Sequence, residues 1–173
     1  MRMLHPAWES FSVLDVETTG FSPQRDRIVE IAVVRLEAGT VIGRWSSLVN
    51  PGIPIPWPAQ ATHGISDEAV QRAPRLLDVL PTVARLVQRS TIVAHNAAFD
   101  SSFLPELRRP WMCTLEMARR AFPNAPNHRL GTLISYLGID RQLRDLRLHR
   151  AGADAEATAL LLLACLEELP AAA

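Results

Sequence analysis

The stretch FSVLDVETTG, residues 11–20, decides the fold of this chain, because it places two acids near the end of an apolar run. The apolar residues at its start are typical of a buried strand, and the Thr-Thr-Gly at 18–20 ends that strand in a turn. Asp15 and Glu17 are spaced i and i+2. In a strand, this spacing puts both side chains on the same face.

Two interpretations of this acid pair are open on these ten residues. Neighbouring carboxylates on an apolar strand repel each other unless a positive charge lies between them, and divalent cations prefer oxygen ligands. The pair therefore fits a metal site. It fits equally a strand end that reaches solvent and carries two surface acids, so the rest of the chain has to decide.

Length and composition predict one globular domain over residues 1–173. A hydrophobic fraction of 48% and a charged fraction of 21% argue against disorder. The formal net charge is zero, so the chain has no overall basic field of the kind that many nucleic-acid-binding proteins show. An enzyme that grips only a few terminal nucleotides needs few phosphate contacts, so this class stays open.

The cysteines and the apolar runs bear on the compartment. Cys113 and Cys165 are the only cysteines, which is too few for a zinc cluster or a disulfide framework. Residues 1–9 lack the apolar core of a signal peptide, and the apolar run at 159–166 is too short to span a bilayer. We therefore expect a cytoplasmic protein with no membrane segment.

The order of the apolar segments predicts a mixed sheet. Residues 28–36 are apolar on both alternating faces, and 41–49 form a more polar strand, so the first three strands make an antiparallel meander. Residues 50–58 contain four prolines and are expected to form a loop. A fourth, short strand at 91–94 follows a helix, and such a crossover makes it parallel to the first.

Helical periodicity and capping residues predict the remaining elements. Ser66 is a candidate N-cap, and an apolar stripe with the helical period follows along residues 76–87. Further helices are expected from residue 97 onward, at 114–121, at 130–137 and at 153–169, of which the last is almost entirely apolar along 160–163.

Two more acids lie near predicted helix starts. Asp100 and Asp154 stand in the first turns of their helices, where the helix dipole favours an acid by roughly 0.3–1 kcal/mol. That preference explains one such acid without any function. It does not explain why His149 stands five residues before Asp154, with small residues between them.

Three stretches, DVETTG at 15–20, HNAAFD at 95–100 and HRAGAD at 149–154, closely resemble in this order the motifs of the DEDDh exonuclease family. This family includes the proofreading subunit of bacterial DNA polymerase III and ribonuclease T. The segments at 62–66, 113–115 and 129–133 are also similar to the family, so the resemblance covers almost the whole chain. The histidine five residues before the last acid is typical of the histidine branch.

The resemblance implies an α/β fold of the ribonuclease H type, with a mixed five-stranded sheet flanked by helices. It also implies that Asp15, Glu17, Asp100 and Asp154 surround two Mg²⁺ or Mn²⁺ ions and that His149 is the general base. Two such ions can clamp the attacking and leaving oxygens of an in-line phosphoryl displacement. A histidine with an ordinary pKa of about 6.5 suits the proton transfer.

The same resemblance suggests four residues for the pocket of the terminal nucleotide: Thr18, His63, Asn96 and Phe99. Phe99 also reads as a core aromatic, whereas His63 has no packing role that the sequence reveals. His5 and His128 receive no role, because nothing in the sequence places them near the site.

Two departures from the family pattern affect the expected partners. The segment 104–111 is short and contains Pro105, which leaves the shape of that rim open. The sequence ends soon after the last helix, so stable attachment to a polymerase is not expected, and a homodimer is left open.

Together, the motifs predict a metal-dependent 3′-to-5′ exonuclease that acts on single-stranded DNA ends and releases nucleoside 5′-monophosphates. A 3′-to-5′ exoribonuclease that trims RNA or short oligoribonucleotides is the alternative enzyme, and it would need a contact with the 2′-hydroxyl. The alternative from another class is a catalytically silent nucleic-acid-binding module. All five catalytic positions are filled, which argues against this alternative, because such a module has no need for clustered charge.

Overall fold

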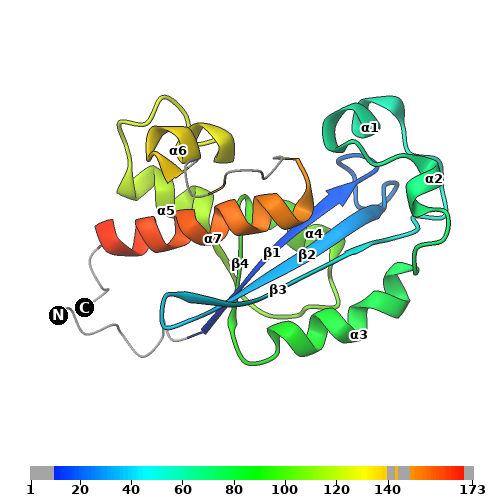
Figure 1. Ribbon diagram of the computed structural model, residues 1–173, viewed down its shortest axis with the longest axis horizontal. Coiled ribbons are helices and arrows are strands. Elements are labelled where there is room, and N and C mark those ends of the chain that lie inside the picture. The colour runs from blue at the N-terminus through cyan, green and yellow to red at the C-terminus, as the bar shows by residue number, and fades with distance from the viewer. Residues whose placement is uncertain (1–9, 140–142, 144–148, 170–173) are drawn as a thin grey trace.

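The chain is built around a five-stranded sheet with the strand order β3-β2-β1-β4-β5, seen in a computed structural model that describes residues 10–139, 143 and 149–169 (Figure 1). The strands are β1 (Ser10–Thr18), β2 (Ile28–Glu37), β3 (Thr40–Leu48), β4 (Thr91–Ala94) and β5 (Trp111–Cys113). β1 pairs antiparallel with β2, as β2 does with β3, whereas β4 is parallel to β1 and β5 to β4. The predicted mixed sheet of five strands is confirmed.

Seven helices are assigned in the part of the chain that the structure describes: α1 (Trp57–His63), α2 (Asp67–Val70), α3 (Leu76–Val87), α4 (Ala97–Phe103), α5 (Thr114–Ala121), α6 (Leu130–Tyr136) and α7 (Ala151–Glu168). Helix α3 makes the predicted crossover between β3 and β4, and Ser66 caps α2 by accepting a hydrogen bond from the Ala69 amide. No helix in these ranges is long and apolar enough to cross a membrane.

Two boundaries differ from the sequence prediction. Residues 57 and 58 were expected in a loop but open α1, because a proline in the first helical turn has no hydrogen bond to lose there. Helix α7 begins at Ala151, two residues before the predicted start at 153, because its first free amide is bound by a carboxylate on β2. The short strand β5 lies directly after the proline-containing segment 104–110, where no strand was predicted.

Alternate residues of β1 point to two different apolar layers. Leu14 and Val16 pack on the face that α3 covers, in a cluster with Val79, Val83 and Val87. Phe11 and Val13 pack on the opposite face, against the alanines and leucines of α7. Small residues at every fourth position of α7, Ala151, Ala155 and Ala159, let this helix lie close to the sheet.

This alternation positions the acids. Asp15 and Glu17 continue the series of Phe11 and Val13, so they lie on the α7 face at the end of β1 where the apolar layer stops. Helix α7 runs back across the sheet, and its first turn lies toward the same end (Figure 1). Strand polarity and helix direction together bring Asp154 to the two acids of β1.

Candidate active site

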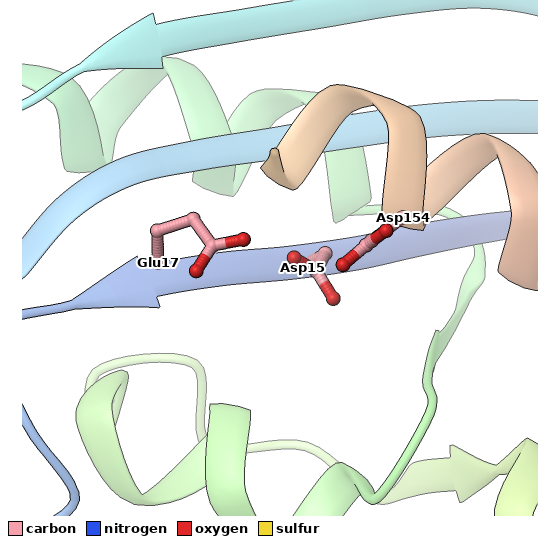
Figure 2. Close-up of side chains that lie close together, drawn as sticks. All are labelled: Asp15, Glu17 and Asp154. Atoms are coloured by element: carbon pink, nitrogen blue, oxygen red, sulfur yellow. The ribbon is translucent and has the colours of Figure 1, made fainter. Parts of the chain in front are cut away.

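Three carboxylates converge where the start of α7 meets the end of β1. One oxygen from each of Asp15, Glu17 and Asp154 lies within 4.8 Å of the others. Figure 2 shows the two side chains of β1 and the Asp154 side chain of α7 around a shared space. All three residues are partly buried. This is a donor set of the kind that hard divalent cations bind.

The electrostatics of this cluster are unfavourable without a positive charge. Burial raises the pKa of Glu17 to about 8, and repulsion from Asp154 and Glu30 adds to the effect. Burial, followed by repulsion from Asp100 and Asp154, raises the pKa of Asp15 well above its ordinary value. Burial also raises the pKa of Asp154. The cluster therefore holds protons at neutral pH unless a cation replaces them.

Asp100, the fourth predicted acid, stands outside this group of three. It is buried at 3% exposure on α4, and its Oδ1 accepts a hydrogen bond from the Val16 amide at 3.2 Å. Burial raises its pKa to about 8, although the bonds from backbone amides lower it in part. Asp100 is thus near enough to repel Asp15, while its carboxylate is held to the backbone of β1.

His149 is tied to Asp154 through its backbone. The His149 amide donates to both oxygens of Asp154, at 3.2 and 3.3 Å, and the residue has a φ of 65°. This left-handed conformation is costly for a residue with a Cβ atom, so the surrounding contacts hold it in place. The side chain of His149 lies at a cavity that Asp154 also lines.

This cavity has a volume of about 770 Å³ and lies between the loop after β1, the turn between β4 and α4, α5, the beginning of α6 and the start of α7. Its lining includes Arg119, Arg129 and His128. His128 received no role from the sequence, and the structure places it at the same cavity as His149. His5 lies outside the described residues.

His95 connects two segments that border this cavity, the start of α5 and the turn before α6. One ring nitrogen lies 3.0 Å from the Thr114 hydroxyl, and the other lies 3.0 Å from the His128 carbonyl oxygen. Burial lowers the pKa of His95, so the ring is neutral. Because one nitrogen is used at the start of α5 and the other at the segment before α6, His95 has no free nitrogen for proton transfer.

The four residues suggested for the nucleotide pocket have different settings. Asn96 is exposed, has a φ of 68° and lines the cavity, whereas the Thr18 hydroxyl donates to the Gly20 carbonyl at 2.6 Å. Phe99 packs against Phe21, with ring centroids 6.3 Å apart.

His63 is buried at 2% exposure at the end of α1. Its Nδ1 accepts a hydrogen bond from the Ile65 amide at 3.0 Å, which is the packing role that the sequence did not reveal. Its Nε2 is buried and makes no hydrogen bond in the structure. Burial lowers the pKa of His63, and the neighbouring Thr18 backbone offsets part of that change.

Comparison with known proteins now identifies the family. Residues 12–162 match the exonuclease family named after ribonuclease T. The nuclease domain of 3′hExo, a DEDDh family member bound to rAMP, superposes with a TM-score of 0.78 over 95% of this chain and 94% of that one, at 21% identity. The chain belongs to the DEDDh family of 3′-to-5′ exonucleases. The resemblance seen in the three motifs is confirmed.

Closer relatives within the DEDDh family are similar in sequence as well as in fold. Exonuclease X, in a complex with 5′ overhanging duplex DNA, is 34% identical, with a TM-score of 0.78 over 91% of each chain. The DNA polymerase III PolC-type proteins of Bacillus subtilis and Oceanobacillus iheyensis are 36% and 38% identical over 92% and 89% of this chain. The chain spans only 12% and 11% of the length of those two relatives.

DEDDh membership implies a divalent metal, and the residues present fit one. Asp15, Glu17 and Asp154 offer clustered oxygens, and their raised pKa values indicate that the protein compensates the buried negative charge only in part. A bound cation would supply that compensation.

Three residues of this site were missed by sequence reasoning. Phe21 is 90% exposed and lines the cavity, and the sequence signal was an aromatic directly after the turn at 18–20. Glu30 and Arg150 form an ion pair at 2.6 Å across 120 residues. The signal for Glu30 in the sequence was a glutamate within an otherwise apolar strand. Nothing in the sequence indicated that Arg150 is its partner.

Proposed function

We propose that this protein is a metal-dependent 3′-to-5′ exonuclease that removes nucleoside 5′-monophosphates from the 3′ end of single-stranded DNA. The observation that carries the proposal is the group of carboxylates Asp15, Glu17 and Asp154. His149 lies next to it, since it lines a cavity together with Asp154. A fold of this family with a silent site would have no reason to keep three acids in a position where burial and repulsion oppose their charge.

The acids have the roles of metal ligands in this proposal. Two Mg²⁺ or Mn²⁺ ions, when bound, would stabilise charge on the attacking and leaving oxygens of an in-line displacement. Asp15, Glu17 and Asp154 would hold these ions through their carboxylate oxygens, with Asp15 lying between the other two acids (Figure 2). Asp100 is assigned a contact through water, in keeping with its bond to the Val16 amide.

His149 is assigned the role of general base. Its imidazole accepts the proton of the attacking water, whose oxygen bonds to phosphorus as the bond from phosphorus to the O3′ atom breaks. The shortened strand keeps a 3′-hydroxyl, and the released nucleotide carries the phosphate on its 5′ carbon. The bond from the His149 amide to Asp154 supports this role, because it keeps the base beside a proposed ligand.

The surroundings of the acids suit the end of a nucleic acid strand. Phe21 is almost fully exposed, yet its loop is held by Asp26, which accepts hydrogen bonds from the Thr19 hydroxyl and the Ser22 amide. A fixed, exposed ring beside Phe99 is suited to stacking against a base. Gly20 is required in this loop, because a Cβ atom there would lie 2.6 Å from the Asp26 carboxylate.

Charged and hydrogen-bonding groups complete the proposed binding site for the nucleic acid. Arg119 and Arg129 line the cavity, and no ion pair engages either of them within the described ranges. Their guanidinium groups are suited to the phosphates next to the scissile bond. Asn96, Thr18 and His63 are assigned to the terminal nucleotide, and of these Asn96 lines the cavity.

Of the two solved structures compared above, the one with the higher sequence identity favours DNA over RNA as the substrate. Exonuclease X, at 34% identity, is in a complex with duplex DNA that has a 5′ overhang. The alternative activity, trimming of RNA or short oligoribonucleotides, requires a protein group that engages the 2′-hydroxyl.

The test is a time course of cleavage with Mg²⁺ or Mn²⁺ on matched DNA and RNA strands labelled at either end. We expect a 3′ label to appear at once as a labelled 5′-mononucleotide, while a 5′ label gives a ladder that shortens by single nucleotides. A 3′-phosphate should slow the reaction strongly, and Asp15→Asn is the inactive control. Efficient cutting of circular single-stranded DNA would contradict an exonuclease, and faster loss of the RNA strand would assign RNA as the substrate.

A further inference from the structure

Glu30 is a buried carboxylate that none of the roles above uses. It lies on β2 at 5% exposure, on the sheet face that α7 covers. Its oxygens accept three hydrogen bonds: from Arg150 Nε at 2.9 Å, from Arg150 Nη2 at 2.6 Å and from the Ala151 amide at 2.9 Å. A two-pronged guanidinium contact of this kind fixes direction as well as distance.

The contact holds the beginning of α7. The helix has no side-chain cap of its own, and its first amide, that of Ala151, is bound by Glu30 from the neighbouring sheet. A carboxylate at this position also interacts favourably with the positive end of the helix dipole. The start of the helix is therefore determined by a residue on β2.

The contact between Glu30 and Arg150 lies next to the residues of the proposed active site. Arg150 directly follows His149 and stands four residues before Asp154, and the His149 amide is bonded to the Asp154 carboxylate. On the sheet, Glu30 is paired with Glu17 in the register of β1 and β2. The ion pair thus connects β2, at the position next to Glu17 of β1, to the segment that holds both His149 and Asp154.

We propose that Glu30 and Arg150 are positioning residues, which set His149 and Asp154 at the correct place and angle opposite the acids of β1. This rests on the proposed function of the site. Arg150 also neutralises Glu30, which would otherwise add an uncompensated charge next to Glu17. Residues that orient metal ligands from behind typically change metal affinity or activity by 10–100-fold when they are replaced.

The chain offers a matched control for a merely structural role. Arg44 on β3 forms an ion pair with Glu156 of α7 at 2.6 Å, so it also ties α7 to the sheet, but at an exposed place beyond Asp154. Arg44→Met removes a contact between the helix and the sheet without altering residues 149–154. If Arg150→Met lowers kcat or Mn²⁺ affinity more than Arg44→Met does, the additional loss is due to the position of the Glu30–Arg150 contact.

The experiment compares Arg150→Met, Arg150→Lys, Glu30→Gln and Arg44→Met in the full chain, below the melting temperature of each. We measure kcat and KM on a labelled single strand, and Mn²⁺ affinity by calorimetry. We expect Arg150→Met to lower kcat or Mn²⁺ affinity by about 10–100-fold with little change in KM. Arg150→Lys, which keeps the charge without the two-pronged contact, should recover part of the loss, and Arg44→Met should stay within about twofold of the parent.

Two further measurements separate positioning from stability. The double variant Glu30→Gln with Arg150→Met should lose no more than the worse single variant, because both remove one contact. In a His149→Ala background, Arg150→Met should cost much less kcat than it costs in the parent. Kinetic and Mn²⁺ values for Arg150→Met equal to those of Arg44→Met, or an equal kcat loss with and without His149, would overturn the positioning role. If the parent cleaves no strand, the proposed function fails, and the Mn²⁺ titration alone decides the role of the pair.

Discussion

The proton held by Glu17 makes the stability of the metal-free protein depend on pH. Burial raises the pKa of this carboxyl from 4.5 to about 8. Between those values the folded chain holds a proton that the unfolded chain has released, so unfolding releases a proton and stability falls as pH rises. The stabilisation is complete below the unfolded value and is lost as pH passes through about 8. We therefore expect the metal-free protein to melt at a lower temperature at pH 7.5 than at pH 5.5.

The size of the effect follows from one proton. A full difference of one bound proton changes the free energy of unfolding by about 1.4 kcal/mol for each pH unit, so two units give roughly 3 kcal/mol. For a protein of this size, 1 kcal/mol corresponds to roughly 2–4 °C in melting temperature. Glu17 alone should therefore lower the melting temperature by roughly 5–12 °C over this range, and Asp15 and Asp100 act in the same direction.

The assay is thermal unfolding in a chelator, with the parent and Glu17→Gln compared at each pH. The comparison is needed because burial lowers the pKa of His63 and His95, which makes stability rise with pH below the ordinary histidine value. Both proteins share that contribution, so it cancels. Glu106→Gln, at an exposed position far along the chain, is the control for loss of a carboxyl.

In the parent, Mn²⁺ should reverse the dependence of the melting temperature on pH. The cation binds the ionised carboxylates, so it stabilises the folded state more at pH 7.5 than at pH 5.5. Glu17→Gln should show a shallower pH dependence in the chelator and a smaller rise with Mn²⁺. The reasoning would be refuted by equal pH slopes in the parent and in Glu17→Gln, since the slope is then not due to this carboxyl.

Four substitutions test the site directly. Asp15→Asn should reduce cleavage to below about 1% of the parent. It should also raise the melting temperature of the metal-free protein, because it removes a repelling charge. Substantial activity in Mg²⁺ would exclude Asp15 as a metal ligand. His149→Ala should lower single-turnover cleavage by about 10²–10⁴-fold with unchanged Mn²⁺ affinity, and lost Mn²⁺ binding would make His149 a ligand. Phe21→Ala should weaken binding of a single-stranded end by the equivalent of about 1–3 kcal/mol, as expected for one lost base stack, and an unchanged dissociation constant would remove Phe21 from the site. Arg119→Ala should raise KM severalfold and make binding less sensitive to salt, whereas Arg85→Ala on α3 should do neither.

The local pattern of the chain contains much of the fold. The apolar run at 28–36, the crossover through the helix at 76–87 and the short run at 91–94 were sufficient to predict a mixed sheet with β4 parallel to β1. The three-residue strand β5 could not be predicted this way, because so short a segment has no periodicity of its own. It is a strand only because β4 offers it hydrogen-bonding partners.

The acids of the site could also be named before the structure. The i, i+2 spacing of Asp15 and Glu17 decides that they share a face of a strand, and elementary backbone geometry determines this without any long-range contact. The motif at 149–154 named Asp154, although the first turn of its helix begins where the distant Glu30 binds the Ala151 amide.

Only the tertiary structure decided what surrounds those acids. The bond between Glu30 and Arg150 joins residues 120 positions apart, and His63 proved to be buried beside Thr18 although the sequence revealed no packing role for it. His128 lines the cavity because its carbonyl oxygen lies at the ring of His95, directly after β4. Sequence periodicity determines which face a side chain takes on its own element, but the residue that it meets depends on strand register and helix packing. Those are set by the burial of the whole core.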